Sequence, residues 1–378
     1  MGDVLIYGDT VRSPELRHEV PLLVPDGFLY AEAGGARHLA VSSMEIPRLR
    51  EVGDYELHPL EEFGLDELVA SGRTLAEVER GIAVRAVVAL GVEHAVVPGS
   101  FSLGLADGLR DRGVFLEVDQ ELFDARRRVK NARELVGVRR AQTAAEAGMA
   151  ATVELLRRAE PCGGAVVLDG EPLTSERLKL AIDTAFLAHG CVADEFVVAH
   201  GPQSAVGHEM GSGAILAGEP IVIDIWPRDK QSSCFADMTR TFVVGEPSEE
   251  LVEWHRLTLE ALERALADVR PGADANAIFA GTCELYEAAG YPTQRTKKPD
   301  ETLADGFHHA RCHGVGLDVH EAPILGRIAG DRLVAGDVIT LEPGLYRQGV
   351  GGCRLEDLVL VTEEGSENLT RFTYDLRP

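Results

Sequence analysis

The chain has 378 residues, of which 45% are hydrophobic and 26% charged, and its formal net charge is −25. These fractions are typical of a soluble globular protein that is long enough to form two domains. The acidic balance argues against nucleic acid and anionic membranes as partners, because phosphate groups are bound by basic surfaces.

The thiols and the N-terminal sequence indicate the compartment. Six cysteines are dispersed along the chain without a CxxC pair, a pattern typical of reduced intracellular thiols. The first ten residues, MGDVLIYGDT, contain no long apolar segment, so we expect no signal peptide. No apolar run reaches the length of about 18 residues that predicts a membrane span. We therefore expect a cytoplasmic protein.

Residues 1–125 are predicted to form a smaller α/β domain. Strand-like apolar runs at 4–7, 83–90, 95–97 and 114–118 alternate with polar or helix-like segments. Four histidines, His18, His38, His58 and His94, are scattered in this part, and we expect them to be surface or structural residues, not metal ligands. The domain is expected to control substrate access or to contribute an interface, including a dimer interface.

Residues 126–378 show a pattern that occurs twice. Asn131 and Glu134 resemble a capping box at the start of a long helix, whose apolar positions recur at helical spacing as far as Leu156. A second helix at 173–189 and a strand at 195–199 follow. Two further helices are predicted at 249–269 and 275–289. After each helix pair comes a hairpin of apolar runs, which predicts an internal pseudo-repeat.

Each predicted hairpin carries two carboxylates. Asp224 and Asp237 lie 13 positions apart around a turn near Lys230, and Glu342 and Glu356 lie 14 positions apart. A single strand-end acid is ordinarily explained by a hydrogen bond to the backbone. Four acids in one apolar pocket, however, cannot all ionise without cations. With His313 as a fifth ligand, oxygen and imidazole donors suit two ions of Mn²⁺, Fe²⁺, Co²⁺ or Zn²⁺.

These segments resemble the creatinase/prolidase/methionine aminopeptidase family, the pita-bread metallopeptidases. The resemblance lies in IDIW, FADMTRTF, HGVGLDVHE, TLEPGLY and RLEDLVLVT, which occur in the family's order. It implies an α+β fold, with a pita-bread catalytic domain over residues 126–378 after an α/β creatinase-type domain over 1–125. The two-domain layout further resembles the Xaa-Pro dipeptidase and Xaa-Pro aminopeptidase branch.

The resemblance also implies an activity and a set of site residues. The activity is hydrolysis of the bond between an N-terminal residue and proline, in di- or oligopeptides, by a hydroxide that bridges two divalent ions, most readily Mn²⁺. Family members with this layout are often homodimers. The implied metal ligands are Asp224, Asp237, His313, Glu342 and Glu356. The implied catalytic residues are His208, which would contact the scissile amide, His320, which would stabilise the developing oxyanion, and Glu342, which would move a proton. The implied substrate-binding residues are His309 and Arg354, the latter also orienting carboxylates.

The chain departs from the family pattern at two places. The two aspartates lie further apart than is usual in the family, although the added length preserves the alternation of the strands. Arg311 and Cys312 precede the histidine ligand, and Cys312 is expected to point away from the site because side chains alternate across a strand. Two alternatives remain open. They are another metal-dependent hydrolase or lyase on the same fold, and a catalytically silent binding module.

Overall fold

The computed structural model describes residues 2–309, 311–326 and 330–378, and for Arg311 it describes the backbone only. The chain divides into two compact units, an N-terminal unit, Met1–Arg127, and a C-terminal unit, Arg128–Pro378. Within the described ranges, no helix combines the length and the apolar composition needed to cross a membrane. All six cysteines are free thiols, as their dispersion predicted.

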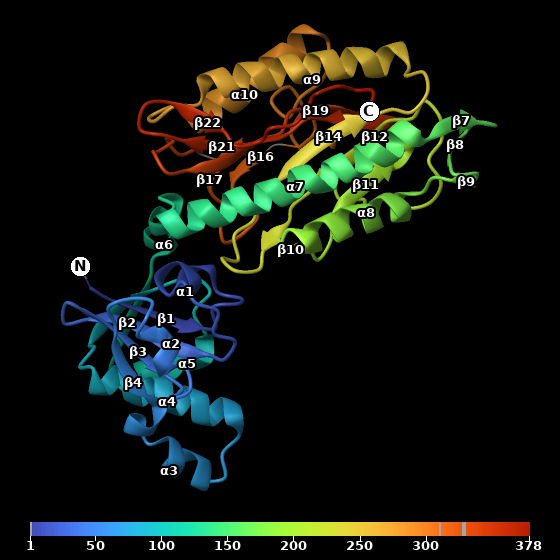
Figure 1. Cartoon of the computed structure of the whole chain (residues 1–378). Coiled ribbons are helices and arrows are strands. Elements are labelled where there is room, and N and C mark those ends of the chain that lie inside the picture. Colours follow the sequence, from blue (N-terminus) through green and yellow to red (C-terminus); the bar gives the residue numbers. More distant parts are fainter. Residues whose placement is uncertain (1, 310, 327–329) are drawn as a thin grey trace. The chain divides into compact units, whose positions relative to one another are not determined.

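The N-terminal unit is built on one six-stranded sheet with the order β4-β3-β2-β1-β5-β6. Its strands are β1 (Asp3–Gly8), β2 (Phe28–Ala33), β3 (Ala36–Val41), β4 (Glu56–Pro59), β5 (His94–Val97) and β6 (Phe115–Val118). Strands β1, β2 and β3 pair antiparallel, whereas β4, β5 and β6 join in parallel pairs. Helices of this unit are α1 (Pro14–Glu19), α2 (Ile46–Leu49), α3 (Leu65–Ala70), α4 (Leu75–Ala89), α5 (Leu103–Arg110) and α6 (Gln120–Arg128) (Figure 1).

One expectation for this unit was wrong, and one pair of histidines is closer than the sequence suggested. The apolar run 83–90 is the second half of helix α4, which begins at a capping box of Thr74 and Glu77. A short apolar run cannot be assigned by periodicity alone, and the capping box was the signal that settles it. The histidines are also not all scattered, because His38 on β3 and His58 on β4 are neighbours, 3.2 Å apart between ring nitrogens.

The C-terminal unit contains two pairs of long helices, as predicted. The first pair is α7 (Ala132–Arg158) and α8 (Ser175–Ala188), and the second pair is α9 (Glu249–Asp268) and α10 (Ala275–Ala288). Helix α7 begins at Asn131, whose side chain accepts from the Glu134 N–H while Glu134 accepts from the Asn131 N–H, so the predicted capping box is confirmed.

The strands of this unit form several small sheets, of which the central ones lie between the helix pairs (Figure 1). They are β7 (Glu160–Cys162), β8 (Ala165–Leu168), β9 (Glu171–Pro172), β10 (Cys191–Val192), β11 (Val197–His200), β12 (Ile221–Ile225), β13 (Arg228–Asp229) and β14 (Met238–Phe242) in the first half. The second half contributes β15 (Asp305–Gly306), β16 (Arg311–Gly314), β17 (Glu321–Gly326), β18 (Val338–Leu341), β19 (Gly344–Arg347), β20 (Gly351–Arg354), β21 (Asp357–Val361) and β22 (Ser366–Asn368).

The two halves repeat the order of helix pair, strand and hairpin, as the sequence predicted. In the first half, β12 lies between β11 and β14. In the second half, β18 lies between β16 and β21 in a five-stranded sheet. This is the α+β pita-bread architecture, and its central strands are almost entirely buried, for example every residue of β14 and β21.

Candidate metal centre

The first hairpin places its two aspartates on one face. Strands β12 and β14 are antiparallel, with Asp224 opposite Thr239. Asp237 lies two positions before Thr239, and side chains two positions apart share a face of a strand. The connection between the two aspartates contains the turn around Lys230 and the short strand β13, which pairs with β10. The connection therefore leaves both aspartates on the same face of the hairpin.

The second hairpin brings its two glutamates opposite each other at a change of sheet. Strands β18 and β21 pair up to Leu341 and Asp357, and β19 and β20 pair from Gly344 and Arg354 onward. The β18–β21 register, extended by one position, and the β19–β20 register, extended by two, both set Glu342 against Glu356. Each glutamate therefore lies where its chain leaves one sheet and enters the next.

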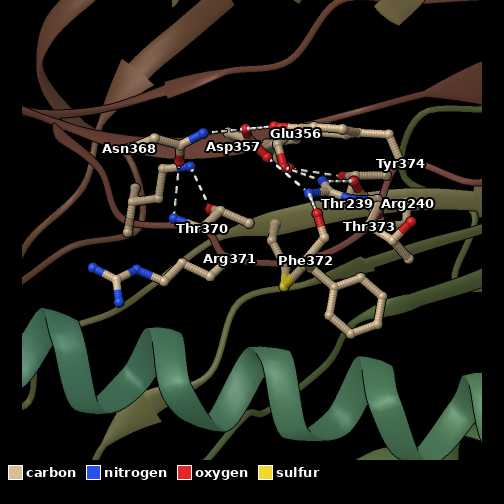
Figure 2. Close-up of polar contacts among 12 residues, drawn as sticks. Thr239, Arg240, Glu356, Asp357, Asn368, Thr370, Arg371, Phe372, Thr373 and Tyr374 are labelled. Carbon is tan, nitrogen blue, oxygen red and sulfur yellow. Dashed lines mark hydrogen bonds and ion pairs between the residues drawn. The ribbon is translucent and has the colours of Figure 1, made fainter. Parts of the chain in front are cut away.

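Thr239 connects the two hairpins. Its hydroxyl donates to the Glu356 carboxylate at 2.7 Å, and its carbonyl accepts from the Glu356 N–H at 3.0 Å (Figure 2). A second connection runs from the Thr241 hydroxyl to the Arg354 carbonyl at 2.9 Å. The acidic residues of the two halves are thus fixed relative to each other by hydrogen bonds between β14 and the end of β20.

His313 is oriented with one ring nitrogen toward the carboxylates. Its Nδ1 lies 3.2 Å from the Gly314 carbonyl, which can only accept, so Nδ1 carries the hydrogen and a neutral ring leaves Nε2 bare. That Nε2 lies 3.5 Å from Glu342 Oε1 and 3.8 Å from Asp237 Oδ2. Gly314 is required beside it, because an added Cβ would lie 2.3 Å from the Ala322 carbonyl oxygen.

The structure brings three of the five predicted ligands into one cluster. Donor atoms of Asp237, His313 and Glu356 all lie within 4.8 Å of one another, and all three residues are buried. Glu342 adjoins the cluster through His313, while the Asp224 carboxylate pairs with the Arg354 guanidinium. Asp237 Oδ1 is buried and has no hydrogen-bond partner. A buried acceptor without a donor fits a site that a cation completes.

Electrostatics supports the same interpretation. Burial, reinforced by the charges of Glu356, Asp224 and Glu342, raises the pKa of Asp237 well above its ordinary value. Burial likewise raises the pKa of Glu342 to about 8, against the opposing effect of Arg354. Burial, with the nearby His320 ring, lowers the pKa of His313 to about 3. The pocket thus contains a neutral imidazole and acids that need protons or cations, and this donor set suits divalent ions.

Among the described residues, Arg354 is the only cation that lies against the Asp224 carboxylate. It is buried, its Nε donates to the Thr239 hydroxyl at 3.1 Å, and it reaches the Tyr346 hydroxyl at 3.4 Å. The sequence named Arg354 as a substrate-binding residue that also orients carboxylates. Its contacts in the structure are those of an orienting residue, because its guanidinium is used by Asp224, Thr239 and Tyr346.

The three histidines predicted to contact the substrate differ in their exposure to solvent. His309 Nε2 lies 3.2 Å from the Tyr346 hydroxyl and its Nδ1 lies 3.6 Å from Glu342. His320 is exposed and sets its ring against His313, with centroids 4.3 Å apart. His208 is exposed, and its charge is one of several that, after burial, hold the pKa of His309 well below its ordinary value.

A buried arginine behind the predicted ligands was not itself predicted. Arg240 donates to the Glu356 carbonyl at 2.7 Å, to the Asp357 carboxylate at 2.9 Å and to the Thr373 carbonyl at 2.8 Å (Figure 2). Asp357 also accepts from Asn368 and from Tyr374. The cluster fixes the backbone of Glu356 and ties the C-terminal segment to it.

The signal for this cluster was present in the sequence. Arg240 lies inside an apolar strand, in the FADMTRTF segment, and a charged residue there requires a buried partner.

Cys312, in contrast, lies as predicted. It packs against the apolar cluster that includes Leu325 and Ile339, on the strand position next to His313. The Arg311 side chain lies outside the described residues.

A family model and several individual proteins resemble this chain in sequence. The model of metallopeptidase family M24 matches residues 136–363. The chain is 36% identical over 185 residues to a Xaa-Pro dipeptidase of Pyrococcus furiosus, a match that covers 49% of each protein. It is 30% identical over 284 residues to a probable dipeptidase PepE of Mycobacterium bovis, covering 74% of this chain and 68% of that protein. The match to the Pyrococcus relative therefore spans about half of that relative's length.

Solved structures resemble the chain over its whole length. The prolidase of Pyrococcus horikoshii has a TM-score of 0.77 at 23% identity, over 100% of this chain and 95% of that one. The X-Pro aminopeptidase of Thermotoga maritima has a TM-score of 0.78 at 22% identity, over 100% and 97%. At these identities the likeness establishes the fold. The family match covers residues 136–363, which is more than half of the chain. The chain therefore belongs to metallopeptidase family M24.

Proposed function

We propose that this protein is a metal-dependent exopeptidase that hydrolyses the bond between an N-terminal residue and proline. One observation carries the proposal. In a chain of family M24, Asp237, His313 and Glu356 converge to within 4.8 Å in a buried pocket. The similarity to a Xaa-Pro dipeptidase in sequence and to a prolidase in fold supports the preference for proline.

The residues present fit divalent ions. We propose Asp224, Asp237, His313, Glu342 and Glu356 as the ligands of two ions, with Mn²⁺ as the first candidate. Support comes from the unpartnered Asp237 Oδ1, the bare Nε2 of His313 and the acids whose pKa values burial raises. When bound, such ions would lower the pKa of a water and polarise the scissile carbonyl.

Glu342 is the proposed proton carrier. Its buried carboxyl lies 3.5 Å from His313 Nε2, beside the other proposed ligands, where it can exchange a proton with a bound water. In the proposed reaction it accepts a proton from the attacking water and delivers it to the nitrogen of proline as the peptide bond breaks. Its Oε1 lies 3.4 Å from the Thr340 hydroxyl, which positions the carboxyl.

The histidines are proposed to bind the peptide. His320 would donate an N–H to the oxygen that becomes negative during attack, a kind of support worth roughly 2.7–4 kcal/mol in other enzymes. His208 would contact the scissile amide. His309 and Tyr346, 3.2 Å apart, would line the pocket for the proline ring.

The first test combines metal content with peptide cleavage. Chelator-stripped protein is reconstituted with Mn²⁺ and assayed on Ala-Pro and on a longer peptide that begins with Ala-Pro. Glu356→Gln removes one ligand charge while preserving the shape, and we expect it to lose bound metal and turnover together. Glu367→Gln is the matched control, because Glu367 pairs with Arg139 on the surface of the same unit.

The outcomes separate the alternatives. Release of alanine from the dipeptide alone indicates a dipeptidase, and release from the longer peptide indicates an aminopeptidase. Bound metal without cleavage of either peptide would favour another hydrolase or lyase. Failure to bind metal would favour a silent binding module. Near-normal turnover by Glu356→Gln would contradict the proposed ligand set. Assembly as a homodimer stays a prediction, which sedimentation velocity would test.

A further inference from the structure

A second group of metal-ligating side chains lies in the N-terminal unit. His38 is on β3, and Glu56 and His58 are on the neighbouring strand β4. The strands pair in parallel, with His38 opposite Glu56 and Ala40 opposite His58. Residues two positions apart share a face, so all three side chains emerge on one side of the sheet. Their donor atoms lie within 4.8 Å of one another.

The hydrogen bonds of the two rings leave their inner nitrogens facing each other. His38 Nε2 lies 3.2 Å from the Ala33 carbonyl, which can only accept, so this nitrogen donates. His58 Nδ1 lies 3.0 Å from the Glu62 carboxylate and donates to it. In neutral rings the remaining nitrogens, His38 Nδ1 and His58 Nε2, are then both bare, yet they lie 3.2 Å apart. Two lone pairs at that distance call for a metal ion or a shared proton between them.

The distances fit a transition metal. Zinc binds imidazole nitrogen at about 2.0–2.1 Å in tetrahedral geometry, so two of its ligand atoms lie about 3.3 Å apart. The nitrogens are 3.2 Å apart, and His38 Nδ1 is 3.3 Å from Glu56 Oε2. The outer nitrogens contact a carbonyl and a carboxylate, the usual arrangement behind histidine ligands. Stacking of the rings, at 5.4 Å between centroids, further fixes the pair.

We propose that His38, Glu56 and His58 form a binding site for Zn²⁺ or a similar divalent transition metal, separate from the pocket of the C-terminal unit. Two imidazoles and one carboxylate select such ions over Ca²⁺ and Mg²⁺. The side chain of Glu56 is 61% exposed, so an ion can enter from solvent and keep a water as its fourth ligand. Because β4 ends the order of the sheet, the ion would fasten this last strand to β3.

The competing explanation is a proton shared between the two rings, with Glu56 and Glu62 balancing its charge. That arrangement would also satisfy the facing nitrogens, but it would bind no metal. The two explanations therefore predict different metal contents for the same protein.

The test measures how many zinc ions the whole chain binds. Chelator-stripped wild type, His58→Gln and His94→Gln are dialysed to equilibrium against the same free Zn²⁺ concentration, and bound metal is measured by elemental analysis. His94 is the matched control, because it is also a histidine on a strand of this sheet beside a glutamate, at 3.6 Å. We expect wild type and His94→Gln to hold one zinc ion per chain more than His58→Gln. Equal contents in the three proteins would overturn the proposal.

A second variant avoids the ligands themselves. Glu62 contacts only the outer nitrogen of His58 and its side chain is 51% exposed, so Glu62→Gln should fold normally. We expect it to weaken zinc binding at this site by roughly 10–100-fold, as loss of a partner behind a ligand does. Unchanged affinity would contradict the proposal. Whatever the C-terminal pocket binds is common to all these proteins, so the comparison does not depend on the proposed peptidase activity.

Discussion

Glu342→Gln tests whether the buried acids of the metal-free pocket destabilise the fold as pH rises. Burial raises the pKa of Glu342 from an ordinary 4.5 to about 8. Below pH 4.5 the carboxyl is protonated in both the folded and the unfolded chain. Above it, the unfolded chain loses the proton while the folded chain keeps it until about pH 8. The unfolded state then binds fewer protons, so the free energy of unfolding falls as pH rises through this window.

The size of the effect follows from the same shift. Each pH unit inside the window costs about 1.4 kcal/mol. Between about pH 5.5 and about pH 8 the free energy of unfolding of metal-free wild type should therefore fall by roughly 3 kcal/mol through Glu342 alone. Glutamine has a similar shape, can still accept from Thr340, and does not titrate. The Glu342→Gln protein should lack this part of the decrease.

Urea unfolding followed by tryptophan fluorescence is the assay. Both tryptophans, Trp226 and Trp254, lie in the C-terminal unit, so the signal reports on the unit that contains the pocket. The comparison uses chelator-stripped proteins at several pH values, and added Mn²⁺ should flatten the wild-type curve. Parallel pH profiles for wild type and Glu342→Gln would refute the reasoning, because burial of this carboxyl would then have no cost.

Two further substitutions test the surroundings of the pocket. Arg240→Ala should lower the free energy of unfolding by roughly 3–5 kcal/mol, because it leaves the Asp357 carboxylate buried without its cation. The exposed pair of Arg139 and Glu367 is the control, since Arg139→Ala should cost at most about 1 kcal/mol, and equal losses would contradict the argument. His208→Ala should keep its full metal content but lower kcat by roughly 100-fold, and a metal-free His208→Ala protein would show that the residue was wrongly assigned.

Local signals allowed much of the C-terminal unit to be predicted. The capping box at Asn131 located helix α7, and the acids on the apolar runs marked both hairpins. The register shows why this works, since Glu342 and Glu356 are set opposite each other by the pairing of consecutive segments. Where two paired residues are close in sequence and the apolar pattern between them is regular, the sequence is enough to predict their pairing.

Other features depend on pairings that the sequence does not display. His38 and His58 are 20 positions apart and meet only because β3 and β4 pair in parallel across a helical connection. Arg240 meets Asp357, 117 positions away, through contact between the two halves. The run 83–90 shows a different failure, because a buried face of a helix and a buried strand have the same short apolar composition.

The change of sheet at Glu342 and Glu356 determines where this chain can vary in length. Beyond the last pair of the hairpin, Arg347 and Gly351, residues 348–350 form a turn, in which a Cβ added at Gly349 would meet no atom within 4 Å. Residues or a short tag inserted at this tip would leave the glutamates opposite each other. Loss of a single residue from β19 would instead shift the pairing and turn one carboxylate away from the pocket. Length changes are therefore best tolerated at the tip of this hairpin and least tolerated in its strands.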